Sequence, residues 1–510
     1  MSKMNVKIKT ALLSVFDKTG IERFAQGLVD RNINIIATGK TATVLKGSNI
    51  PFRILEEITH YPELMGGRVK SLHPKIYAGI LGHRVKDAYN AMKYDIEWID
   101  LVVCNFYPFS EKAKSGSDFS EIVTYIDIGG PTMLRAAAKN FEWAVPLCCK
   151  EDYEVLLTKI DDDALDLPFR QTLAEKAFFQ TAAYELQIAN YFMKMNSQNR
   201  TIQNPNHLFM LNFHTKLRYG ENPHQTGALY RLNDQCPLLD CTQLHGKPMS
   251  YNNYLDASFA MELTKEFADP TCVIIKHTNP CSVSSQPSIQ EAIQKAWFAD
   301  SKSAFGGVVA INRPLDLASL TFLSQYFIEI ILAPSVTQEA KNNLNLMKNC
   351  RVLQVDFSKD NEQTDDYRFI SGAVLKQSKN INKDKLKFDQ VKLSGSQEQD
   401  VQFAWNVVKY AKSNAIVIAK DSTTLAIGSG QVSRIDAVAL AVHKSKSNLS
   451  GAVLASDGFF PFRDSIDLLS ETGISTIITP KGSIRDNEIA TACEEHGITL
   501  IFSPYRAFSH

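Results

Sequence analysis

The segment KTALLSVFDKTGIERFAQGLVDRNINIIATGKT, residues 9–41, sets the fold class. Residues 9–15 are a short apolar run typical of a buried strand, and residues 33–37 are a second one. The apolar side chains between them recur at helical spacing on one face: Ile21, Phe24, Ala25, Leu28 and Val29. Strand, helix and strand in this order predict a right-handed βαβ unit, so we expect an α/β protein that opens with a parallel sheet.

The α/β pattern continues along the chain. Further strands are predicted at residues 101–104, 272–275, 308–311, 328–332, 415–419, 452–455, 475–479 and 499–502. Residues 150–200 and 487–495 predict helices, whereas the polar residues 357–366 and 380–399 predict surface loops. We find no short-period internal repeat. The polar stretch NSQNRTIQNPNH, residues 196–207, is the predicted domain boundary and divides the chain into residues 1–198 and 199–510.

Composition excludes several classes of protein. The 510 residues are 44% hydrophobic and 22% charged, which is ordinary for a globular chain. Lys plus Arg and Asp plus Glu both number 55, so we expect no nucleic-acid or membrane partner, although a local basic pocket is compatible with this balance. No apolar run reaches the roughly 18 residues of a membrane span, and the N-terminus lacks a signal-peptide core. Nine scattered cysteines without a C-x-x-C pair favour a cytoplasmic chain with no structural zinc.

Two glycine motifs are incomplete. Thr38-Gly39-Lys40-Thr41 contains the G-K-T of a P-loop, but Asn34 occupies the position of its first glycine. A monophosphate cradle at a helix N-terminus is the better prediction for this turn. Gly428-Ser429-Gly430 is followed by Ser433 where a dinucleotide fingerprint needs glycine, which argues against a nicotinamide cofactor.

Two further segments of the first half favour an anionic ligand. GGRVKSLHP, residues 66–74, places two cations and a hydroxyl within four residues, although a solvated basic loop would have the same composition. In DIGGPTMLRAAAKN, residues 127–140, an acid precedes a Gly-Gly-Pro turn and an alanine-rich helix. Paired glycines beside an acid indicate close approach of the backbone to a ligand, and the alternative is a helix start with surface cations.

The second half contains four more candidate segments. RYGENPHQ, residues 218–225, groups polar and aromatic residues around two turn formers. KHTNPC, residues 276–281, places Lys beside His at a strand end, which is typical of an acid/base pair, with a structural histidine as the alternative. Its Pro-Cys pair is similar to that of zinc deaminases, but their second cysteine and H-x-E are absent. SAFGG (303–307) and SDGFFPFRD (456–464) favour stacking of a flat ligand or a buried aromatic core.

Taken together, these segments resemble a bifunctional purine biosynthesis family. It joins phosphoribosylaminoimidazolecarboxamide (AICAR) formyltransferase to inosine monophosphate (IMP) cyclohydrolase. The resemblance runs from about Ala11 to His510 and is carried, in order, by RVKSLHPK, IDIGGPTMLRAAAKN, LRYGENPHQ, KHTNPC, SAFGG, KSNAI, GSGQVSR, SDGFFPFRD and GSIRD.

The resemblance implies two enzymes on one chain. Residues 1–198 would form a methylglyoxal-synthase-like domain, a doubly wound parallel sheet that cyclizes formylated AICAR (FAICAR) to IMP with loss of water. Residues 199–510 would form a zinc-free cytidine-deaminase-like domain in two subdomains. It would transfer a formyl group from 10-formyltetrahydrofolate to the 5-amino group of AICAR. The resemblance further implies a cytoplasmic homodimer that needs no metal, with a monovalent cation left open.

The resemblance also implies residue roles in the cyclohydrolase. The substrate would be bound by Ser14, Lys18, Thr38, Gly39, Lys40, Thr41, Arg68, Ser71, Asn105, Gly129 and Gly130. The catalytic set would be Lys70, Tyr107, Asp127 and Lys139. Lys139 or a backbone N–H would stabilise the oxyanion, and Asp127 or Tyr107 would move protons.

In the formyltransferase, Lys276, His277 and Asn414 match catalytic positions. His277 would take a proton from the attacking amine, Lys276 would stabilise charge on the formyl oxygen, and Asn414 would lie near the formyl group. Substrate positions would be Arg218, Tyr219, Phe305, Gly306, Glu329, Phe459, Asp464 and Arg506.

Two residues depart from the family pattern at the cyclohydrolase. Phe16 replaces a serine and thus removes a hydrogen-bond donor, and Lys40 replaces a glycine of the phosphate turn. The added cation of Lys40 can bind phosphate in compensation. The alternative is an active formyltransferase joined to an N-terminal nucleotide-binding domain whose cyclohydrolase is weakened or lost.

Overall fold

The computed structural model describes residues 6–67, 69–195, 208–232, 235–359, 365–380, 386 and 393–510. The chain divides into unit 1, Met1–Met210, and unit 2, Leu211–His510. The stretch 196–207, where the sequence predicts the domain boundary, lies outside the described residues. No helix in the described part of the chain is long and apolar enough to cross a membrane.

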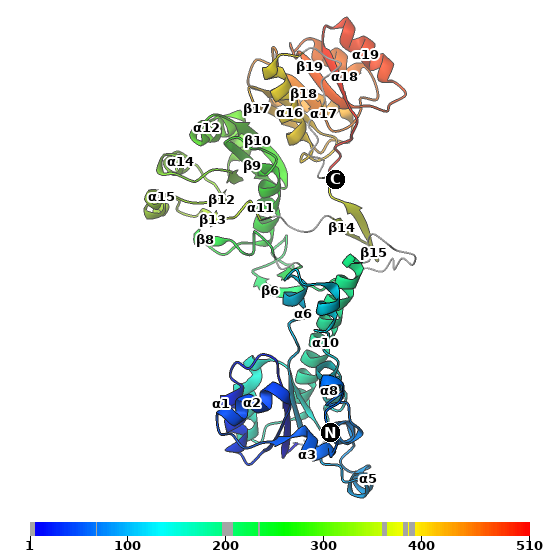
Figure 1. Cartoon of the computed structure of the whole chain (residues 1–510). Coiled ribbons are helices and arrows are strands. Elements are labelled where there is room, and N and C mark those ends of the chain that lie inside the picture. Colours follow the sequence, from blue (N-terminus) through cyan, green and yellow to red (C-terminus); the bar gives the residue numbers. More distant parts are fainter. Residues whose placement is uncertain are drawn as a thin grey trace. The chain divides into compact units, whose positions relative to one another are not determined.

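Unit 1, blue to cyan in Figure 1, is built on a five-stranded parallel sheet. Its strand order is β3-β2-β1-β4-β5. The strands are β1 (Thr10–Ser14), β2 (Asn34–Ala37), β3 (Arg53–Ile54), β4 (Leu101–Cys104) and β5 (Val145–Leu147). Strand order reverses beside β1, because the chain first builds β2 and β3 on one side and later β4 and β5 on the other. At such a switch point, the carboxyl ends of the strands form a crevice for ligands.

Helices cover both faces of this sheet. They are α1 (Ile21–Val29), α2 (Gly39–Gly47), α3 (Leu55–Thr59), α4 (Pro74–Leu81), α5 (Ala88–Lys93), α6 (Phe109–Ala113), α7 (Phe119–Val123), α8 (Gly129–Lys139), α9 (Tyr153–Asp161) and α10 (Leu167–Met195), with short 3-10 turns at Met65–Gly67 and Lys150–Asp152. Successive residues of β1 point to opposite faces. Leu13 packs with Phe24 of α1, whereas Leu12 packs with Ile80 of α4 and Leu134 of α8. The predicted doubly wound parallel sheet is confirmed.

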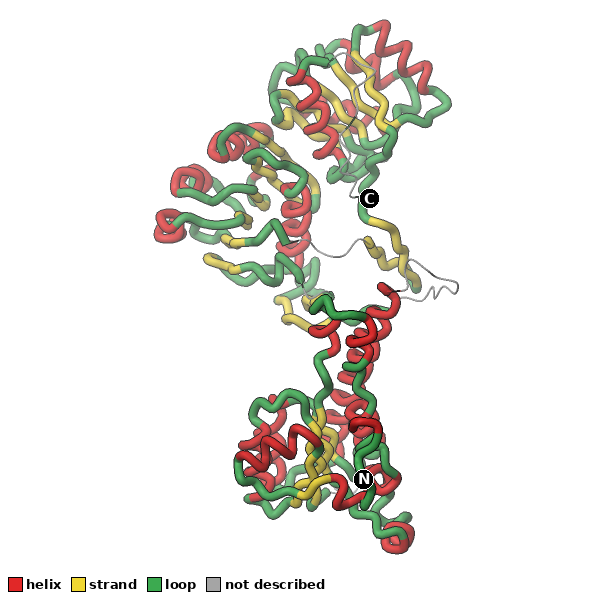
Figure 2. Tube along the Cα trace, in the orientation of Figure 1, coloured by secondary structure: helices red, strands yellow, loops and turns green. Residues whose placement is uncertain are grey.

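Unit 2 contains an 11-stranded mixed sheet in the order β20-β19-β18-β16-β17-β10-β9-β11-β12-β13-β8. Its strands are β8 (Thr242–His245), β9 (Thr271–Lys276), β10 (Asn279–Ser285), β11 (Val308–Ile311), β12 (Ile330–Ala333), β13 (Arg351–Gln354), β16 (Ile416–Lys420), β17 (Thr423–Gly428), β18 (Val453–Ser456), β19 (Thr476–Pro480) and β20 (Thr499–Ser503). Two separate hairpins are β6 (Asn212–Leu217) with β7 (Gly227–Arg231), and β14 (Asp365–Ile370) with β15 (Ala373–Ser378), the latter clear in Figure 2.

The large sheet has two halves with the same plan. The helices are α11 (Tyr251–Thr264), α12 (Ile289–Ala299), α13 (Ser301–Ala304), α14 (Leu317–Leu323), α15 (Gln338–Asn342), α16 (Gly395–Val408), α17 (Arg434–Lys444), α18 (Asp464–Ser470) and α19 (Asp486–Glu495), with a 3-10 turn at Leu344–Leu346. In each half a helix precedes an antiparallel hairpin, α11 before β9–β10 and α16 before β16–β17. Ala257 of α11 and Ala404 of α16 lie in one core cluster. The halves meet where Ser284 of β10 pairs with Thr423 of β17.

Each of the two predicted surface loops extends too far at its C-terminal end, into a strand or a helix. Strand β14 begins at Asp365, inside the stretch 357–366, and helix α16 begins at Gly395, inside the stretch 380–399. Ser394 caps α16, because its hydroxyl accepts the N–H of Gln397 at 3.3 Å while the side chain of Gln397 accepts the N–H of Ser394 at 3.1 Å. Capping residues are polar, so composition alone assigned a helix start to a loop.

Leu12→Ala is expected to lower the free energy of unfolding of unit 1 by about 2–5 kcal/mol, because it leaves a cavity in the centre of the sheet. Leu12 is 0% exposed, whereas the control Val85 is 71% exposed. Val85→Ala should change stability by less than about 0.5 kcal/mol. Urea denaturation of the full chain measures both variants, and equal losses would contradict the core position of Leu12.

Candidate active sites

The loops that follow β1 and β2 meet at the carboxyl end of the sheet in unit 1. The Thr38 hydroxyl donates to Ser14 Oγ at 2.7 Å. The Thr41 hydroxyl accepts the N–H of Val15 at 3.2 Å and donates to its carbonyl oxygen at 3.1 Å. The ammonium of Lys18 also donates to the Val15 carbonyl. Predicted substrate-binding groups from two strand ends are therefore adjacent.

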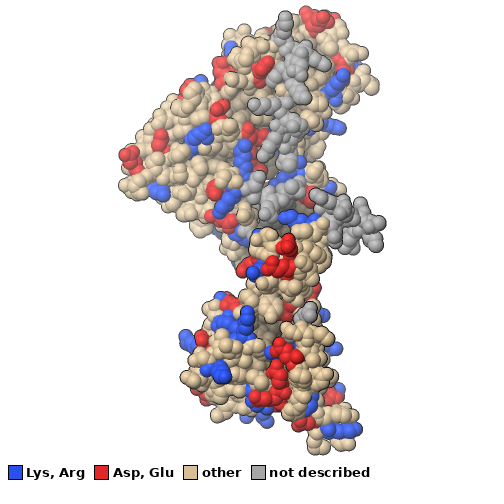
Figure 3. Space-filling view, viewed as in Figure 1, with Lys and Arg blue, Asp and Glu red and all other residues tan. Residues whose placement is uncertain are grey.

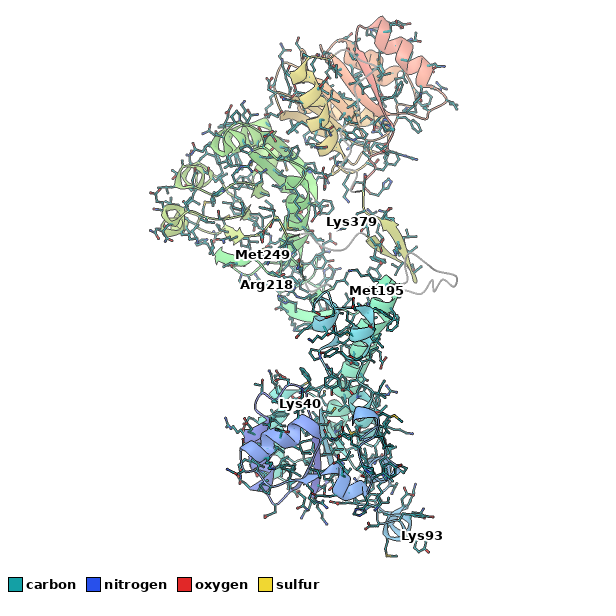
Figure 4. The ribbon with its side chains drawn as sticks, viewed as in Figure 1. Lys40, Lys93, Met195, Arg218, Met249 and Lys379 are labelled. Carbon is teal, nitrogen blue, oxygen red and sulfur yellow. The ribbon has the colours of Figure 1, made fainter. Side chains whose placement is uncertain are left out.

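Two lysines supply positive charge to this corner. Lys40 is exposed in the first turn of α2, after Gly39, whose φ of 44° is left-handed. Burial, together with repulsion by the charge of Lys40, lowers the pKa of Lys18. In Figure 4, Lys40 lies on unit 1 between the labelled Lys93 and Met195, and Figure 3 shows basic side chains gathered at the upper left of the lower lobe. Two neighbouring cations beside a helix N-terminus favour binding of a phosphate group.

Asn105, the first residue after β4, holds the loop that follows β1. Its Oδ1 accepts the N–H of Phe16 at 2.5 Å and that of Asp17 at 2.9 Å. Its Nδ2 donates to the carbonyl oxygen of Asp17 at 3.2 Å. The ring of Phe16 meets the edge of Tyr107 with centroids 5.3 Å apart. The amide of Asn105 is thus occupied by the backbone of this loop, and Phe16 links the loop to Tyr107.

Asp127 is packed against the first turn of α8. Its Oδ1 accepts the N–H of Gly130 at 2.9 Å. Burial raises the pKa of Asp127, although hydrogen bonds from neighbouring backbone N–H groups oppose this change. A Cβ at Gly130 would lie 2.6 Å from Asp127 Oδ2 and 3.1 Å from Cys104 Sγ, and one at Gly129 would lie 2.7 Å from Ser71 Oγ. Both glycines are therefore needed for close packing around this carboxylate.

Lys70 and Tyr107 are electrostatic neighbours of this group. The Lys70 ammonium lies 2.6 Å from a Glu63 carboxylate oxygen and 3.5 Å from one of Glu56. Burial opposes the charged form of Lys70, but these two carboxylates prevail and raise its pKa. Burial and the nearby carboxylate of Asp127 raise the pKa of Tyr107, while Lys70 lowers it. The phenol is thus protonated at neutral pH and is placed to donate a proton.

Lys139 does not join this group. It is the last residue of α8, whereas Asp127 precedes the first residue, Gly129. Because a helix rises about 1.5 Å per residue, Lys139 lies about 15 Å along the axis from Gly129. Its side chain is exposed. Arg68, another predicted phosphate ligand, lies outside the described residues.

In unit 2, Lys276 ends β9 and His277 begins the turn into β10. Lys276 pairs with Asn279, and the two residues between them, His277 and Thr278, have φ of 53° and 56°. This is a two-residue hairpin turn of the type that needs positive φ at both central positions. His277 is exposed, and the Lys276 ammonium donates to the carbonyl oxygen of Phe305 at 2.8 Å.

Phe305, Gly306 and Glu329 gather beside Lys276. Phe305 is 56% exposed and lies against Phe327, with ring centroids 5.3 Å apart. Gly306 has φ of 73°, and its N–H donates to the carbonyl oxygen of Phe327 at 2.8 Å. Glu329 directly precedes β12, the parallel neighbour of β11. The Lys276 ammonium thus contacts the backbone of the residue that carries the exposed Phe305 ring.

Helix α11 connects the predicted Arg218 loop to the His277 turn. The Arg218 guanidinium lies 5.6 Å from the centre of the Tyr219 ring. Asn252 Nδ2 donates to the carbonyl oxygen of Glu221 in the same loop at 3.2 Å. One turn further along the helix, Asp256 Oδ1 accepts a backbone N–H of the β9–β10 turn at 2.7 Å.

Asn414 is held by a buried ion pair. Arg434 donates to Asn414 Oδ1 at 2.7 Å and also pairs with the carboxylate of Asp457. Asn414 Nδ2 donates to the carbonyl oxygen of Gln431 at 2.9 Å. These partners therefore fix the orientation of the Asn414 amide, with its oxygen toward Arg434 and its nitrogen toward the carbonyl oxygen of Gln431.

The segment before Asn414 lies against the β9–β10 hairpin, since the N–H of Lys412 donates to Asn279 Oδ1 at 3.0 Å. Phe459 is 38% exposed in the loop after β18. Two predicted residues make contacts elsewhere in the described part of unit 2. The Asp464 carboxylate accepts the N–H of Ser465, and the Arg506 guanidinium lies 4.9 Å from the Phe508 ring centre.

Three residues that support these sites are missing from the predicted set. The Tyr184 hydroxyl accepts the N–H of Asp127 at 2.8 Å, Arg434 holds Asn414, and Asp256 holds the His277 turn. Arg434 lies in the quoted segment GSGQVSR, whose polar composition was the available signal. Tyr184 and Asp256 lie in helices, where side-chain spacing carries no sign of such a role. Within the described ranges no group of His, Cys, Asp and Glu is arranged to hold a metal ion.

Two family models match this chain. The MGS-like domain matches residues 20–132, and the AICARFT/IMPCHase bienzyme matches residues 137–444. The bifunctional purine biosynthesis protein PurH of Oceanobacillus iheyensis is 41% identical over 98% of this chain and 100% of its own length. That of Aquifex aeolicus is 43% identical over 98% and 100%. That of Buchnera aphidicola subsp. Schizaphis graminum is 42% identical over 100% of both. Among solved structures, ForH is 34% identical over 36% of this chain and 100% of its own, with a TM-score of 0.33.

A methylglyoxal-synthase-like sheet with a basic corner, followed by a second α/β unit, defines an enzyme of nucleotide chemistry with two domains. The chain belongs to the AICARFT/IMPCHase bienzyme family. It is a bifunctional enzyme of purine biosynthesis, with AICAR formyltransferase and IMP cyclohydrolase activities.

Gly130→Ala is expected to lower the kcat of IMP formation from FAICAR about 100-fold, because the new Cβ would displace the Asp127 carboxylate. Formyl transfer should be unchanged. Gly47→Ala is the matched control, since a Cβ there meets nothing within 4 Å. Ring closure is followed by ultraviolet absorbance, and an unaltered rate in Gly130→Ala would contradict a role for this carboxylate geometry.

Proposed function

We propose that unit 1 carries the cyclohydrolase site and unit 2 the formyltransferase site, within domains 1–198 and 199–510. The division rests on one observation: Lys18, Lys40 and the half-buried Asp127 gather around the carboxyl ends of β1, β2 and β4. Positive charge beside a half-buried carboxylate suits a nucleotide monophosphate whose base is held for proton transfer.

In the cyclohydrolase, the phosphate of FAICAR is bound at the N-terminus of α2 by Thr38, Lys40 and Lys18. The carboxamide nitrogen attacks the formyl carbon, and the Asp127 carboxylate takes the proton that the nitrogen loses, while the protonated Tyr107 phenol donates a proton to the formyl oxygen. The formyl oxygen, now a hydroxyl on the closed ring, takes a second proton from Asp127 and leaves as water when its bond to carbon breaks. The former formamide nitrogen loses its proton, which restores Tyr107, and the C=N bond of the purine ring forms. Lys139 lies at the far end of α8. We therefore assign stabilisation of the oxyanion to Lys70, which is close enough to Tyr107 for its charge to lower the pKa of that phenol.

Most of the rate of this ring closure comes from orientation, because both reacting groups belong to one molecule. The remaining predicted residues are proposed to bind and align the substrate: Ser14, Gly39, Thr41, Arg68, Ser71, Asn105, Gly129 and Gly130.

In the formyltransferase, the 5-amino group of AICAR attacks the formyl carbon of 10-formyltetrahydrofolate. His277 takes the proton from this amine, and the N10 nitrogen of the folate leaves with a proton as tetrahydrofolate. Lys276 keeps its hydrogen bond to Phe305 and has two further ammonium protons for the formyl oxygen. Asn414 lies near the formyl group.

The substrate pockets are proposed to be lined by Arg218, Tyr219, Phe305, Gly306, Glu329, Phe459, Asp464 and Arg506. The exposed rings of Phe305 and Phe459 favour stacking on the flat purine precursor or on the pterin of the folate. On the basis of the family resemblance, we further propose a cytoplasmic homodimer whose formyltransferase sites are completed across the interface. The proposal includes no metal, and a monovalent cation is left to direct measurement.

The alternative, a weakened cyclohydrolase, gains no support from the described contacts. Phe16 contributes its backbone N–H to Asn105 and its ring to Tyr107. Lys40 adds charge beside Lys18. Both departures from the family pattern are therefore compatible with an active cyclohydrolase.

His277→Ala is expected to lower kcat/KM of formyl transfer by about 10²–10⁴-fold, because it removes the general base. Ring closure of FAICAR by the same preparation should be unchanged. Both half-reactions are measured on the purified full chain. Full formyl transfer by His277→Ala would refute the catalytic assignment, and absence of FAICAR closure in the wild type would favour the alternative function.

Lys40→Gly is expected to raise the KM for FAICAR about tenfold, because a charge-assisted hydrogen bond to the phosphate is lost. The kcat of closure and formyl transfer should be unchanged. Lys93→Ala, which lies well away from Lys40 in Figure 4, is the charge-matched control. Equal losses in both half-reactions would instead indicate a folding defect.

A further inference from the structure

Unit 2 contains the same arrangement twice: a capped helix followed by an antiparallel hairpin whose turn is bound by an aspartate of the helix. Helix α11 follows the cap residue Ser250 and helix α16 follows Ser394, and both helices have capping boxes. Six residues after each cap stands an aspartate, Asp256 or Asp400. Each aspartate accepts backbone N–H groups from the turn of the hairpin that follows its helix.

The two turns have the same geometry. Asp256 Oδ1 lies 2.7 Å from the nitrogen of Thr278, and the carboxylate oxygens of Asp400 lie 3.0 Å and 2.7 Å from the nitrogens of Asp421 and Ser422. The central residues have φ of 53° and 56° in the first turn, and of 51° and 50° in the second. Each is a two-residue hairpin turn without glycine.

The lysine beside each turn is also repeated. Lys276 donates to the carbonyl oxygen of Phe305 at 2.8 Å, and Lys420 donates to that of Ser450 at 2.8 Å. The next residue in each case is a glycine with φ of 73° or 74°. The copies differ in their chemistry, because Asp421 and Ser450 stand where the first copy has His277 and Phe305. The second copy is therefore the same frame without the imidazole and the ring.

Consecutive left-handed residues with side chains are disfavoured, because the Cβ crowds the following carbonyl oxygen. Neither turn has the glycine or asparagine that normally relieves this crowding. A carboxylate that accepts the N–H of the turn supplies the missing stabilisation. Without it, the turn of β9–β10 is free to relax toward ordinary φ, and the imidazole of His277 moves with the backbone.

We propose that Asp256 is a positioning residue for formyl transfer, which holds the β9–β10 turn in the conformation that places His277. Asp400 holds the equivalent turn that carries no catalytic histidine. This inference rests on the proposed role of His277.

Asp256→Ala is expected to lower the kcat of formyl transfer about 100-fold through displacement of the base. The KM for AICAR should change less than about threefold, and ring closure of FAICAR should be unchanged, since substrate contacts are not removed. Asp256→Asn should recover activity to within about fivefold of the wild type, because its amide oxygen still accepts an N–H. An inactive Asp256→Asn would contradict positioning by this hydrogen bond.

Asp400→Ala is the matched control, because it removes the same support from the duplicate turn. It should leave formyl transfer within about twofold of the wild type while lowering thermal stability at least as much as Asp256→Ala. Equal losses of formyl transfer in the two variants would overturn the proposal and assign both aspartates a purely structural role.

The double variant His277→Ala/Asp256→Ala separates this inference from the proposed function. If Asp256 acts through His277, the double variant transfers formyl groups as slowly as His277→Ala alone. A further multiplicative loss would overturn the proposal. If His277→Ala is impaired and Asp256→Ala is not, only this inference fails; if His277→Ala is fully active, the proposed function fails and this inference with it.

Discussion

Where a strand ends, the backbone N–H groups of the following loop lose their partners in the sheet and need other acceptors, because an unpaired N–H that is shielded from water is costly. This chain supplies side-chain acceptors, some from distant segments and one, Asp127, from the residues directly before the turn that it caps. Asn105 accepts from the loop after β1, and Asp127 accepts from the first turn of α8. Asp256 and Asp400 accept from the two hairpin turns of unit 2. The candidate active-site residues are carried on these same loops. Their positions therefore depend on the side chains that accept hydrogen bonds from the backbone N–H groups of the loops.

Charge is concentrated locally in a chain whose formal net charge is zero. In unit 1, Lys18 and Lys40 lie close enough for Lys40 to lower the pKa of Lys18. In unit 2, the buried Arg434–Asp457 pair orients the amide of Asn414. A buried pair of this kind contributes little net stability but leaves few alternative arrangements for the groups that it binds. In both units, therefore, charged side chains help to fix the geometry of small sites.

The two halves of unit 2 show how one frame can carry different chemistry. The helix cap, the aspartate, the hairpin and the lysine recur in both halves, but His277 is matched by Asp421. The halves share one sheet and one core cluster that includes Ala257 and Ala404. Fold and site are separable in this sense, because the frame is a backbone arrangement and the reaction depends on which side chain it presents.

Local periodicity was sufficient for the fold class. Residues 101–104 and 308–311 are strands with the predicted bounds, since buried parallel strands are short apolar runs that need no knowledge of their neighbours. Starts of helices were less visible, and α16 begins inside a predicted loop because its capping residues are polar.

Contiguous motifs also identified most candidate site residues, because strand-end loops carry their functional groups close together in sequence. The two ends of motif 127–140 lie apart within the chain, since helix α8 separates Asp127 from Lys139, and the catalytic role of Lys139 stays a prediction. The roles of Tyr184 and Asp256 arise from hydrogen bonds to backbone groups 57 and 22 residues away. The amino-acid pattern alone determined the fold class and the family and proposed the reacting groups. The supporting contacts became evident only in the folded chain, because they join segments that have no local signal of each other.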